Sequence, residues 1–242
     1  ESWQMPTVLS LERVHSRMRE FEFVVHYEPG ADSLMDVFHD HPGLTARTSE
    51  CTTTTDAMWR VDHLRGPATA ISAAEEIFID HDRCNECLDD HACDTYREYH
   101  VLDREATSLT VYTYRREIQD CHSVPYIVTD HVGEGAIFEA SRSGGEYRWK
   151  VLYPEDQPVG ELYDAIETEL REGLSLEVSH LTEAGRWDPI SQAEADLSPD
   201  ARGVLEAAAD AGYYERPRET TVGELSDELD VPRSTLQYRL RN

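Results

Sequence analysis

The last 22 residues of the chain, 221–242, have the pattern of two short helices joined by a tight turn. Thr221 and Glu224 have the spacing of a capping box, in which each side chain satisfies a free backbone N–H at a helix start. The apolar residues that follow recur at spacings of three and four and share one helical face, namely Val222, Leu225 and Leu229. Pro232 ends this helix, because the residue before a proline is disfavoured in the α conformation.

A second helix is predicted to begin near Arg233 and to turn Leu236 and Leu240 inward. Two helices joined in this way form a helix-turn-helix, whose second helix can lie in the major groove of DNA, although the spacing also fits a plain helical hairpin. Arginines bind phosphates or guanine, glutamine binds adenine, and hydroxyls bind phosphates or base edges. The residues expected to contact DNA are Arg233, Ser234, Thr235, Gln237 and Arg241, with Arg239 expected at a phosphate.

Another helix is predicted before this pair, because Leu197-Ser198-Pro199-Asp200 has the form of an N-cap followed by proline at the first helical position. The segment LSPDARGVLEAAADAGYYERPRETTVGELSDELDVPRSTLQYRLR closely resembles the C-terminal domain of the bacterio-opsin activator-like regulators of haloarchaea. Its matching landmarks are the opening Leu-Ser, the AGYYERPRE segment and the LSDELDVPRSTLQYRLR core. The resemblance covers residues 197–242, under a fifth of the chain. It implies a transcription factor and does not indicate what the other residues sense.

The charge of the chain bears on this prediction. It has 49 acidic residues against 22 basic ones, of which Lys150 is the single lysine, and its net charge of −27 exceeds what solubility requires. Such a surface is similar to that of proteins from a salt-saturated cytoplasm. The charges are dispersed among hydrophobic residues rather than gathered in a block, which favours a folded protein over an acidic tail.

An acidic protein can bind DNA only if its acidic residues lie mainly outside the DNA-binding segment. Residues 197–242 hold nine acids and six arginines, a net of −3, so about −24 lies in residues 1–196. Residues 231–242 hold three arginines and no acid. At molar salt the Debye length falls to about 3 Å, which screens the acidic body but also weakens phosphate attraction. We therefore expect DNA binding to depend on base contacts and shape more than is usual.

The residues before this unit predict an antiparallel α+β domain. Strands are expected at 21–28, 44–54, 57–65, 97–103, 107–115, 124–130, 134–141, 146–153 and 174–178, and helices at 9–19, 31–41, 67–79 and 158–172. This order suggests an antiparallel sheet, for which two ferredoxin-like halves in tandem are one arrangement. The expected division is a sensory and dimerising domain at 1–181, a linker at 182–196 and the all-α helix-turn-helix domain at 197–242.

Three of the five cysteines fall within ten residues, as His81-Asp-Arg-Cys84-Asn-Glu-Cys87-Leu-Asp-Asp-His91-Ala-Cys93. Cys84-x-x-Cys87 has the spacing of a metal knuckle or a reversible dithiol. If the segment is helical, Cys84, Cys87 and His91 share one face. The predicted zinc ligands are Cys84, Cys87, His91 and Cys93, with His81 as a substitute for His91, and Cys121-His122 with Cys51 as an alternative set. An iron–sulfur cluster fits less well, because a fourth nearby cysteine is missing.

Buried, inert cysteines are the competing interpretation, but the polar residues around this cluster argue against it. A thiol redox sensor without metal also fits the spacing. Of the eleven histidines, all before residue 181, only His39-Asp40-His41 forms another metal-like cluster, and a structural role is more common for such residues. No Gly-x-Ser-x-Gly, phosphate-binding or dinucleotide-binding glycine motif occurs.

No signal peptide and no apolar run of about 20 residues is found, which predicts a cytoplasmic protein without a membrane span. We predict a homodimeric, DNA-binding transcriptional regulator and not an enzyme, because symmetric half-sites multiply the few base pairs that one short helix reads. Its sensor would respond to zinc loss, thiol oxidation or a small ligand. Two alternatives remain, a metal-dependent enzyme with Glu86 beside its ligands, and an adaptor whose helix-turn-helix binds a basal transcription factor instead of double-stranded DNA.

Overall fold

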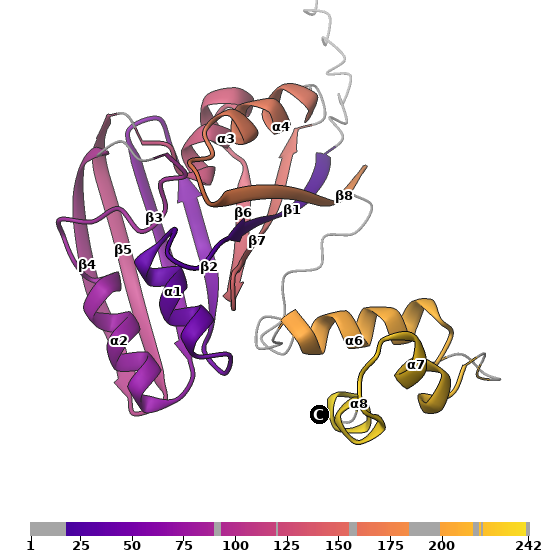
Figure 1. Cartoon of the computed structure of the whole chain (residues 1–242). Coiled ribbons are helices and arrows are strands. Elements are labelled where there is room, and N and C mark those ends of the chain that lie inside the picture. Colours follow the sequence, from indigo (N-terminus) through magenta and orange to yellow (C-terminus); the bar gives the residue numbers. More distant parts are fainter. Residues whose placement is uncertain are drawn as a thin grey trace, which may run out of the picture.

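The computed structural model describes residues 18–89, 93–119, 121–154, 159–183, 199–214, 218 and 220–240. The part before residue 184 is one eight-stranded antiparallel sheet with helices, and the part after residue 198 is all helical (Figure 1). This confirms the predicted α+β class with a helical C-terminal unit.

The strands are β1 (Met18–Tyr27), β2 (Thr45–Thr53), β3 (Ala57–Arg65), β4 (Asp94–Glu105), β5 (Ser108–Gln119), β6 (Ile137–Ser143), β7 (Glu146–Pro154) and β8 (Leu174–Glu183). The helices between them are α1 (Ser33–Asp40), α2 (Ala68–Phe78), α3 (Val124–Val132) and α4 (Val159–Thr168). The C-terminal helices are α6 (Pro199–Asp210), α7 (Val222–Glu228) and α8 (Arg233–Arg239).

The element order β-α-β-β-α-β occurs twice, from β1 to β4 and from β5 to β8. The sheet order is β4-β5-β3-β2-β6-β7-β1-β8, so β5 lies between β4 and β3, and β1 lies between β7 and β8. Each half of the sheet therefore contains three strands of one repeat and the first strand of the other. The two ferredoxin-like repeats exchange their first strands, and β2 pairs with β6 where the halves meet.

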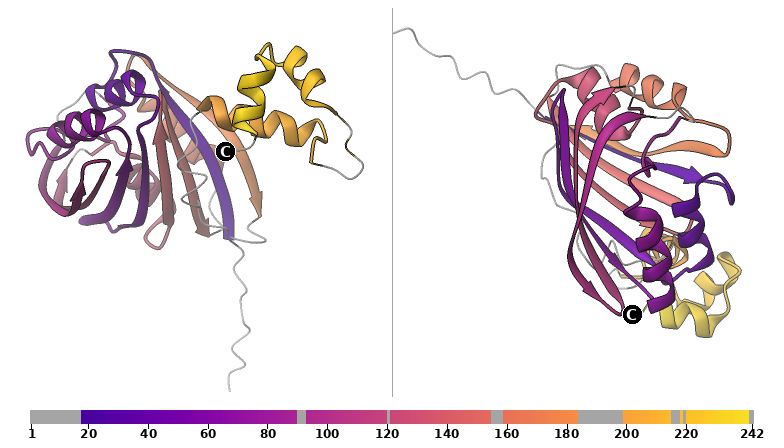
Figure 2. Two further views of the ribbon diagram at one scale, coloured as in Figure 1. Left: turned by 90° about the horizontal axis from the view of Figure 1, so that it is seen from below. Right: turned by 90° about the vertical axis from the view of Figure 1, so that its left-hand side faces the viewer.

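Alternating strand residues build the core of this sheet. Along β3, and along β5 as far as Arg115, every second side chain is buried, as the period of two requires. Helices α1 and α2 pack side by side over one face, and α3 packs against α4 (Figures 1 and 2). Helix α1 begins at Asp32, whose carboxylate accepts from the backbone N–H groups of Leu34 and Met35. The strands twist so strongly across the sheet that β4 and β8 run in different directions (Figure 1).

Residues 124–130 form a helix rather than the predicted strand. Pro125 lies in the first turn of α3, a position where proline is well tolerated. Seven residues of α3 are buried, so its sequence lacks the polar face that marks an amphipathic helix. A short, continuous apolar run of this kind fits a strand or a buried helix equally well, which explains the error.

Other predicted elements also differ. The helix expected over 9–19 falls mostly outside the described residues, and its last two residues, Met18 and Arg19, belong to β1. Residues 84–89 form no helix, so Cys84 and Cys87 do not share a helical face. The linker expected at 182–196 lies outside the described residues except for its start, which continues β8. Among the helices described, none is long and apolar enough to cross a membrane.

Candidate metal centre and DNA-binding helix

Four cysteine thiols converge beside the sheet. Cys84, Cys87 and Cys93 come from the connection between α2 and β4, and Cys121 comes from the connection between β5 and α3. Their four Sγ atoms all lie within 4.8 Å of one another, with 3.1 Å between Cys84 and Cys87 and 3.9 Å between Cys87 and Cys121. Tetrahedral zinc with Zn–S bonds of about 2.3 Å places its sulfurs about 3.8 Å apart. The cluster therefore has the ligand type and the size of a site for one metal ion.

Backbone hydrogen bonds hold the cysteine loop, here residues 80–89 and 93, against the second repeat. Cys87 forms a β-bridge with Ser123, and the Leu88 N–H donates to the His122 carbonyl at 2.9 Å. The Arg171 N–H donates to the Leu88 carbonyl at 2.9 Å, and the Arg171 side chain donates to the Cys87 carbonyl at 2.5 Å. Cys87 and Cys121 therefore belong to neighbouring, paired segments of the backbone.

The structure brings together three of the predicted ligands and adds Cys121. His91 lies outside the described residues, and His81 is exposed, with its Nδ1 3.2 Å from the Arg97 carbonyl. Cys51, which the alternative set joined to Cys121, is buried in β2 and does not belong to the four-thiol group. The pairing of β4 with β5 explains why Cys121 joins this group. Because Asp94 pairs with Gln119, residues just before β4 and just after β5 lie at the same end of the hairpin.

Two arginines donate to the sulfurs of the cluster. Arg115 Nη1 lies 3.2 Å from Cys84 Sγ, and Arg97 Nη2 lies 3.4 Å from Cys93 Sγ. Hydrogen bonds from the Cys121 and Cys87 thiols, with Arg115 nearby, hold the pKa of Cys84 well below its ordinary value. A hydrogen bond with Cys121 lowers the pKa of Cys93 to about 6. The surroundings thus favour the thiolate, the form that binds metal, at Cys84 and Cys93. Hydrogen bonds with Cys121 and Cys84 instead raise the pKa of Cys87, and a hydrogen bond with Cys84 raises the pKa of Cys121.

A buried charge cluster lies directly behind the thiols. Glu86, between Cys84 and Cys87 in the sequence, is 4% exposed and contacts Arg60, Arg115 and Arg142. Asp62 pairs with Arg60 at 2.8 Å and accepts from the Thr48 hydroxyl at 2.7 Å. The three arginines and two carboxylates carry a formal charge of +1. This positive excess also favours negative sulfurs beside it.

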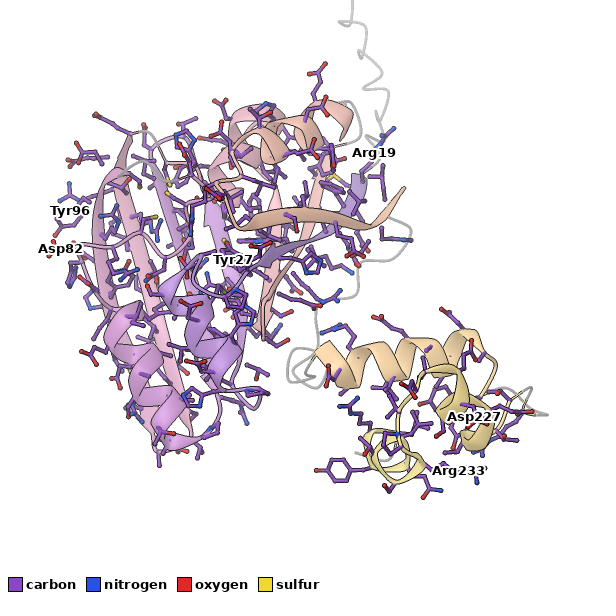
Figure 3. The ribbon with its side chains drawn as sticks, viewed as in Figure 1. Arg19, Tyr27, Asp82, Tyr96, Asp227 and Arg233 are labelled. Carbon is purple, nitrogen blue, oxygen red and sulfur yellow. The ribbon has the colours of Figure 1, made fainter. Side chains whose placement is uncertain are left out.

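Solvent reaches the thiols through a cavity of about 570 Å³. Cys84, Cys87 and Cys93 line it together with residues from the start of α1, the cysteine loop and Arg171. Asp82, another lining residue, lies near the β4 edge of the sheet, as does Tyr96 (Figure 3). A metal ion, chelator or oxidant of small size therefore has access to the sulfurs.

A second group of ligand-type side chains lies next to the first. Asp89, His122 and Glu169 have ligand atoms within 4.8 Å of one another, and His122 Nδ1 contacts Glu169. His122 and Glu169 also line a cavity of about 370 Å³ that reaches Cys121. His39, of the predicted weak cluster, instead hydrogen-bonds the Tyr27 carbonyl at 2.8 Å, which is a structural role.

The C-terminal helices pack around a small apolar core made of Val204, Ala208, Leu225 and Leu236, with Leu229 and Leu240 partly buried beside it. Thr221 and Glu224 form the predicted capping box, since Thr221 accepts from the Glu224 N–H and Glu224 accepts from the Thr221 N–H. Asp230, with a φ of 50°, makes the turn between α7 and α8. The local signals in the sequence thus give the predicted helix pair.

Helix α8 exposes three of the five expected DNA contacts that the structure describes. Arg233, Ser234 and Gln237 are exposed, whereas Thr235 is half-buried. Arg233 lies at the start of α8 (Figure 3). Arg239 instead forms an ion pair with Asp200 of α6 at 2.8 Å. Arg241 lies outside the described residues.

Two family models match the chain. HVO_2928_N, described as N-terminal, matches residues 20–187, and HTH_10, described as an HTH DNA binding domain, matches residues 197–242. A search of the curated proteins found no match. The first model covers more than half of the chain, and the second is of the bacterio-opsin activator type that the C-terminal residues resemble. The chain therefore belongs to the HVO_2928_N family and is a DNA-binding transcription regulator with a C-terminal helix-turn-helix domain of the bacterio-opsin activator type.

Proposed function

We propose that this regulator senses its signal at the four-thiol cluster and reads DNA with α8. Residues 1–181 are the sensory and dimerising domain, residues 182–196 the linker and residues 197–242 the DNA-binding domain. The proposed setting is the cytoplasm of a halophilic archaeon. The convergence of four sulfurs within 4.8 Å is the observation that carries the sensory part.

Zinc is the proposed resident ion, held by Cys84, Cys87, Cys93 and Cys121. Four thiolates and a tetrahedral spacing are typical of zinc, whereas an iron–sulfur cluster holds its cysteines farther apart. A site filled by four protein ligands has no open position for a substrate. This supports a structural or sensory role over the alternative of a metal-dependent enzyme.

Zinc loss or thiol oxidation is the proposed signal. Cys84 and Cys87 have sulfurs 3.1 Å apart and line the cavity. When a peroxide accepts two electrons from these two thiolates, a disulfide forms, the peroxide takes up two protons to give two hydroxyl products, and the zinc loses two ligands. The cluster would then change the geometry in which the protein binds DNA.

Metal analysis of anaerobically purified full-length protein tests the sensor. We expect about one zinc per chain, lost in Cys84→Ser and in Cys121→Ser. The matched control is Cys51→Ala, which removes a buried cysteine outside the cluster and should keep the zinc. His91→Ala distinguishes the two ligand sets: zinc retained supports four thiols, and zinc lost supports His91. Protein without metal in every preparation would reject the zinc site.

The DNA-reading surface is proposed to consist of Arg233, Ser234, Thr235 and Gln237, with Arg241 near the end of the chain. The exposure of Arg233, Ser234 and Gln237 supports this assignment. Arg239 is proposed to reach a phosphate only after it releases Asp200. A homodimer would present two such helices to a symmetric site.

Binding to a DNA site selected from a random library tests this surface. Arg233→Ala and Gln237→Ala should each lose about 1–3 kcal/mol of specific binding free energy, as is usual for a base-contacting side chain. Glu206→Gln, which changes an exposed residue of α6, is the control and should not weaken binding. If specific binding survives both α8 variants, α8 is not the reading helix. If no DNA site is selected and a basal transcription factor binds instead, the protein is an adaptor.

A further inference from the structure

Glu86 is the residue through which the cysteine loop contacts the interior of the sheet. Its sequence neighbours on either side, Cys84 and Cys87, belong to the thiol cluster, whereas its own side chain is 2% exposed and contacts buried arginines. One carboxylate oxygen contacts Arg60 and lies 4.0 Å from Arg142 Nη2. The other lies 3.0 Å from Arg115 Nη2. Because Glu86 lies between Cys84 and Cys87 in the sequence, a displacement of the backbone that carries these two cysteines would also displace this carboxylate.

The three arginines come from both halves of the sheet. Arg60 and Arg115 lie on β3 and β5, whereas Arg142 lies on β6, across the junction where β2 pairs with β6. Arg142 also donates to the Asn85 carbonyl of the same loop at 3.4 Å. The loop between Cys84 and Cys87 is therefore attached to the strands on each side of that junction.

The contacts continue into the second repeat. Arg60 Nη1 donates to the Tyr147 hydroxyl at 3.1 Å, and the guanidinium of Arg142 stacks 4.0 Å from the centre of the Tyr147 ring. Tyr147 in turn packs against Trp149, with ring centroids 4.7 Å apart. A continuous chain of buried groups thus joins the thiol cluster to β7.

We propose that Glu86 couples the occupancy of the thiol cluster to the packing of β6 and β7, acting as a positioning residue between the metal site and the junction of the two repeats. This inference rests on the proposed metal-sensing function. With zinc bound, the loop holds Glu86 among the three guanidinium groups. When zinc leaves, the loop loosens and Glu86 withdraws from the arginines. Asp62 is then the one carboxylate of the cluster that still lies beside the three buried arginines, and β6 and β7 repack in response.

A buried ion cluster that serves stability alone is the competing explanation. Such clusters are seldom more stabilising than apolar packing of the same volume. Its position argues for coupling instead, because one guanidinium, that of Arg115, contacts both the Cys84 sulfur and the Glu86 carboxylate. Coupling between two sites is reciprocal, so a change at Glu86 must also change zinc affinity.

Hydrogen exchange of the full-length protein, with zinc and after chelation, tests the coupling. In the natural sequence, chelation should raise exchange in peptides from the cysteine loop and from β6 and β7. In Glu86→Gln, the loop should still respond while β6 and β7 no longer do. Zinc affinity should fall at least tenfold, while the absorption spectrum of the cobalt-substituted site stays that of four thiolates. Glu75→Gln, which alters the surface pair with Arg104, is the control and should behave as the natural sequence.

Tyr147→Phe provides a second variant in case Glu86→Gln does not fold. It removes the hydroxyl that accepts from Arg60 and leaves the thiols and Glu86 untouched. The β7 response should be at least halved, and by the same reciprocity zinc affinity should fall, but by less than in Glu86→Gln. Two results would overturn the coupling alone, in protein that does bind zinc. One is hydrogen exchange in β6 and β7 that does not change on chelation, and the other is a full β6 and β7 response in Glu86→Gln or a full β7 response in Tyr147→Phe. Protein that binds no zinc would overturn the proposed function and this inference together.

Discussion

The guanidinium of Arg233 occupies the space into which a Cβ atom on Gly223 would project. Gly223 lies in the first turn of α7 and is buried, so its lack of a side chain allows Arg233 of α8 to lie against α7. Gly223→Ala should therefore displace the Arg233 side chain, which can move at little cost because it is long and flexible. If Arg233 contacts DNA from this position, affinity for the selected site should fall several-fold, measured by fluorescence anisotropy.

Thermal unfolding separates this effect from a loss of stability. Alanine has a higher helix propensity than glycine, so Gly223→Ala should not lower the melting temperature. Gly203→Ala on α6 is the matched control, because a Cβ there meets open space, and it should keep full affinity. Equal DNA binding by both alanine variants would mean that the Arg233 position seen here is not the one used on DNA.

The pair between Arg239 and Asp200 should restrain a cation that DNA would otherwise attract. Because Asp200 is largely exposed, the pair adds little to stability. Asp200→Asn should leave the melting temperature nearly unchanged and raise affinity for non-specific DNA by a few-fold, and Arg239→Ala should cancel that gain. A gain that persists in the double variant would show that Arg239 does not contact the phosphates.

The capping box should make the C-terminal helices sensitive to acid. Hydrogen bonds from Thr221 lower the pKa of Glu224 below its usual 4.5. A group whose pKa is lowered by folding stabilises the fold above its unfolded pKa, and this contribution is lost as the pH falls through the folded value. Thr221→Ala should cost about 1 kcal/mol near pH 7. The difference from the natural sequence, measured by hydrogen exchange in α7, should shrink near pH 4; a difference that grows on acidification would contradict this account.

Cys84 should be the most reactive thiol of the reduced, metal-free protein. Because its pKa lies well below the ordinary value, Cys84 should still react with iodoacetamide near pH 6, where an ordinary thiol loses about tenfold in rate per pH unit. Burial raises the pKa of Cys51 to about 12, so Cys51 should react only after unfolding. Mass spectrometry of the modified peptides measures both. Zinc should protect Cys84, and uniform labelling of all five cysteines would contradict the prediction.

Specific DNA binding should survive molar salt. The last twelve residues carry a local charge of +3 beside a strongly acidic body, and high salt removes most of the counterion-release contribution. Affinity for the selected site should therefore fall less steeply with potassium chloride than affinity for a scrambled site. A specific complex that forms only at low salt would mean that phosphate attraction dominates.

Local signals predicted much of the fold. Alternating residues in β3 and the capping box of α7 each act within a few residues, so these elements were predictable. Helix α3 was not, because burial on most of its surface removes the helical periodicity that sequence analysis depends on. The exchange of β1 and β5 between the repeats was also beyond prediction, since it requires β1 to pair with β7 and β8, more than a hundred residues away along the chain.

The candidate sites divide in the same way. The helix-turn-helix and its exposed side chains follow from contiguous residues and their spacing, and so does the Cys84-x-x-Cys87 pair. Cys121 joins the cluster because the β4–β5 hairpin returns the chain to the same end of the sheet. Glu86 contacts its three arginines because β5 and β3 are neighbours and β6 follows β2 in the same sheet. These groups interact at distances of a few ångströms in space, but they lie far apart along the chain at no characteristic spacing. The contacts between the thiol cluster and the sheet could therefore be identified only from the tertiary structure.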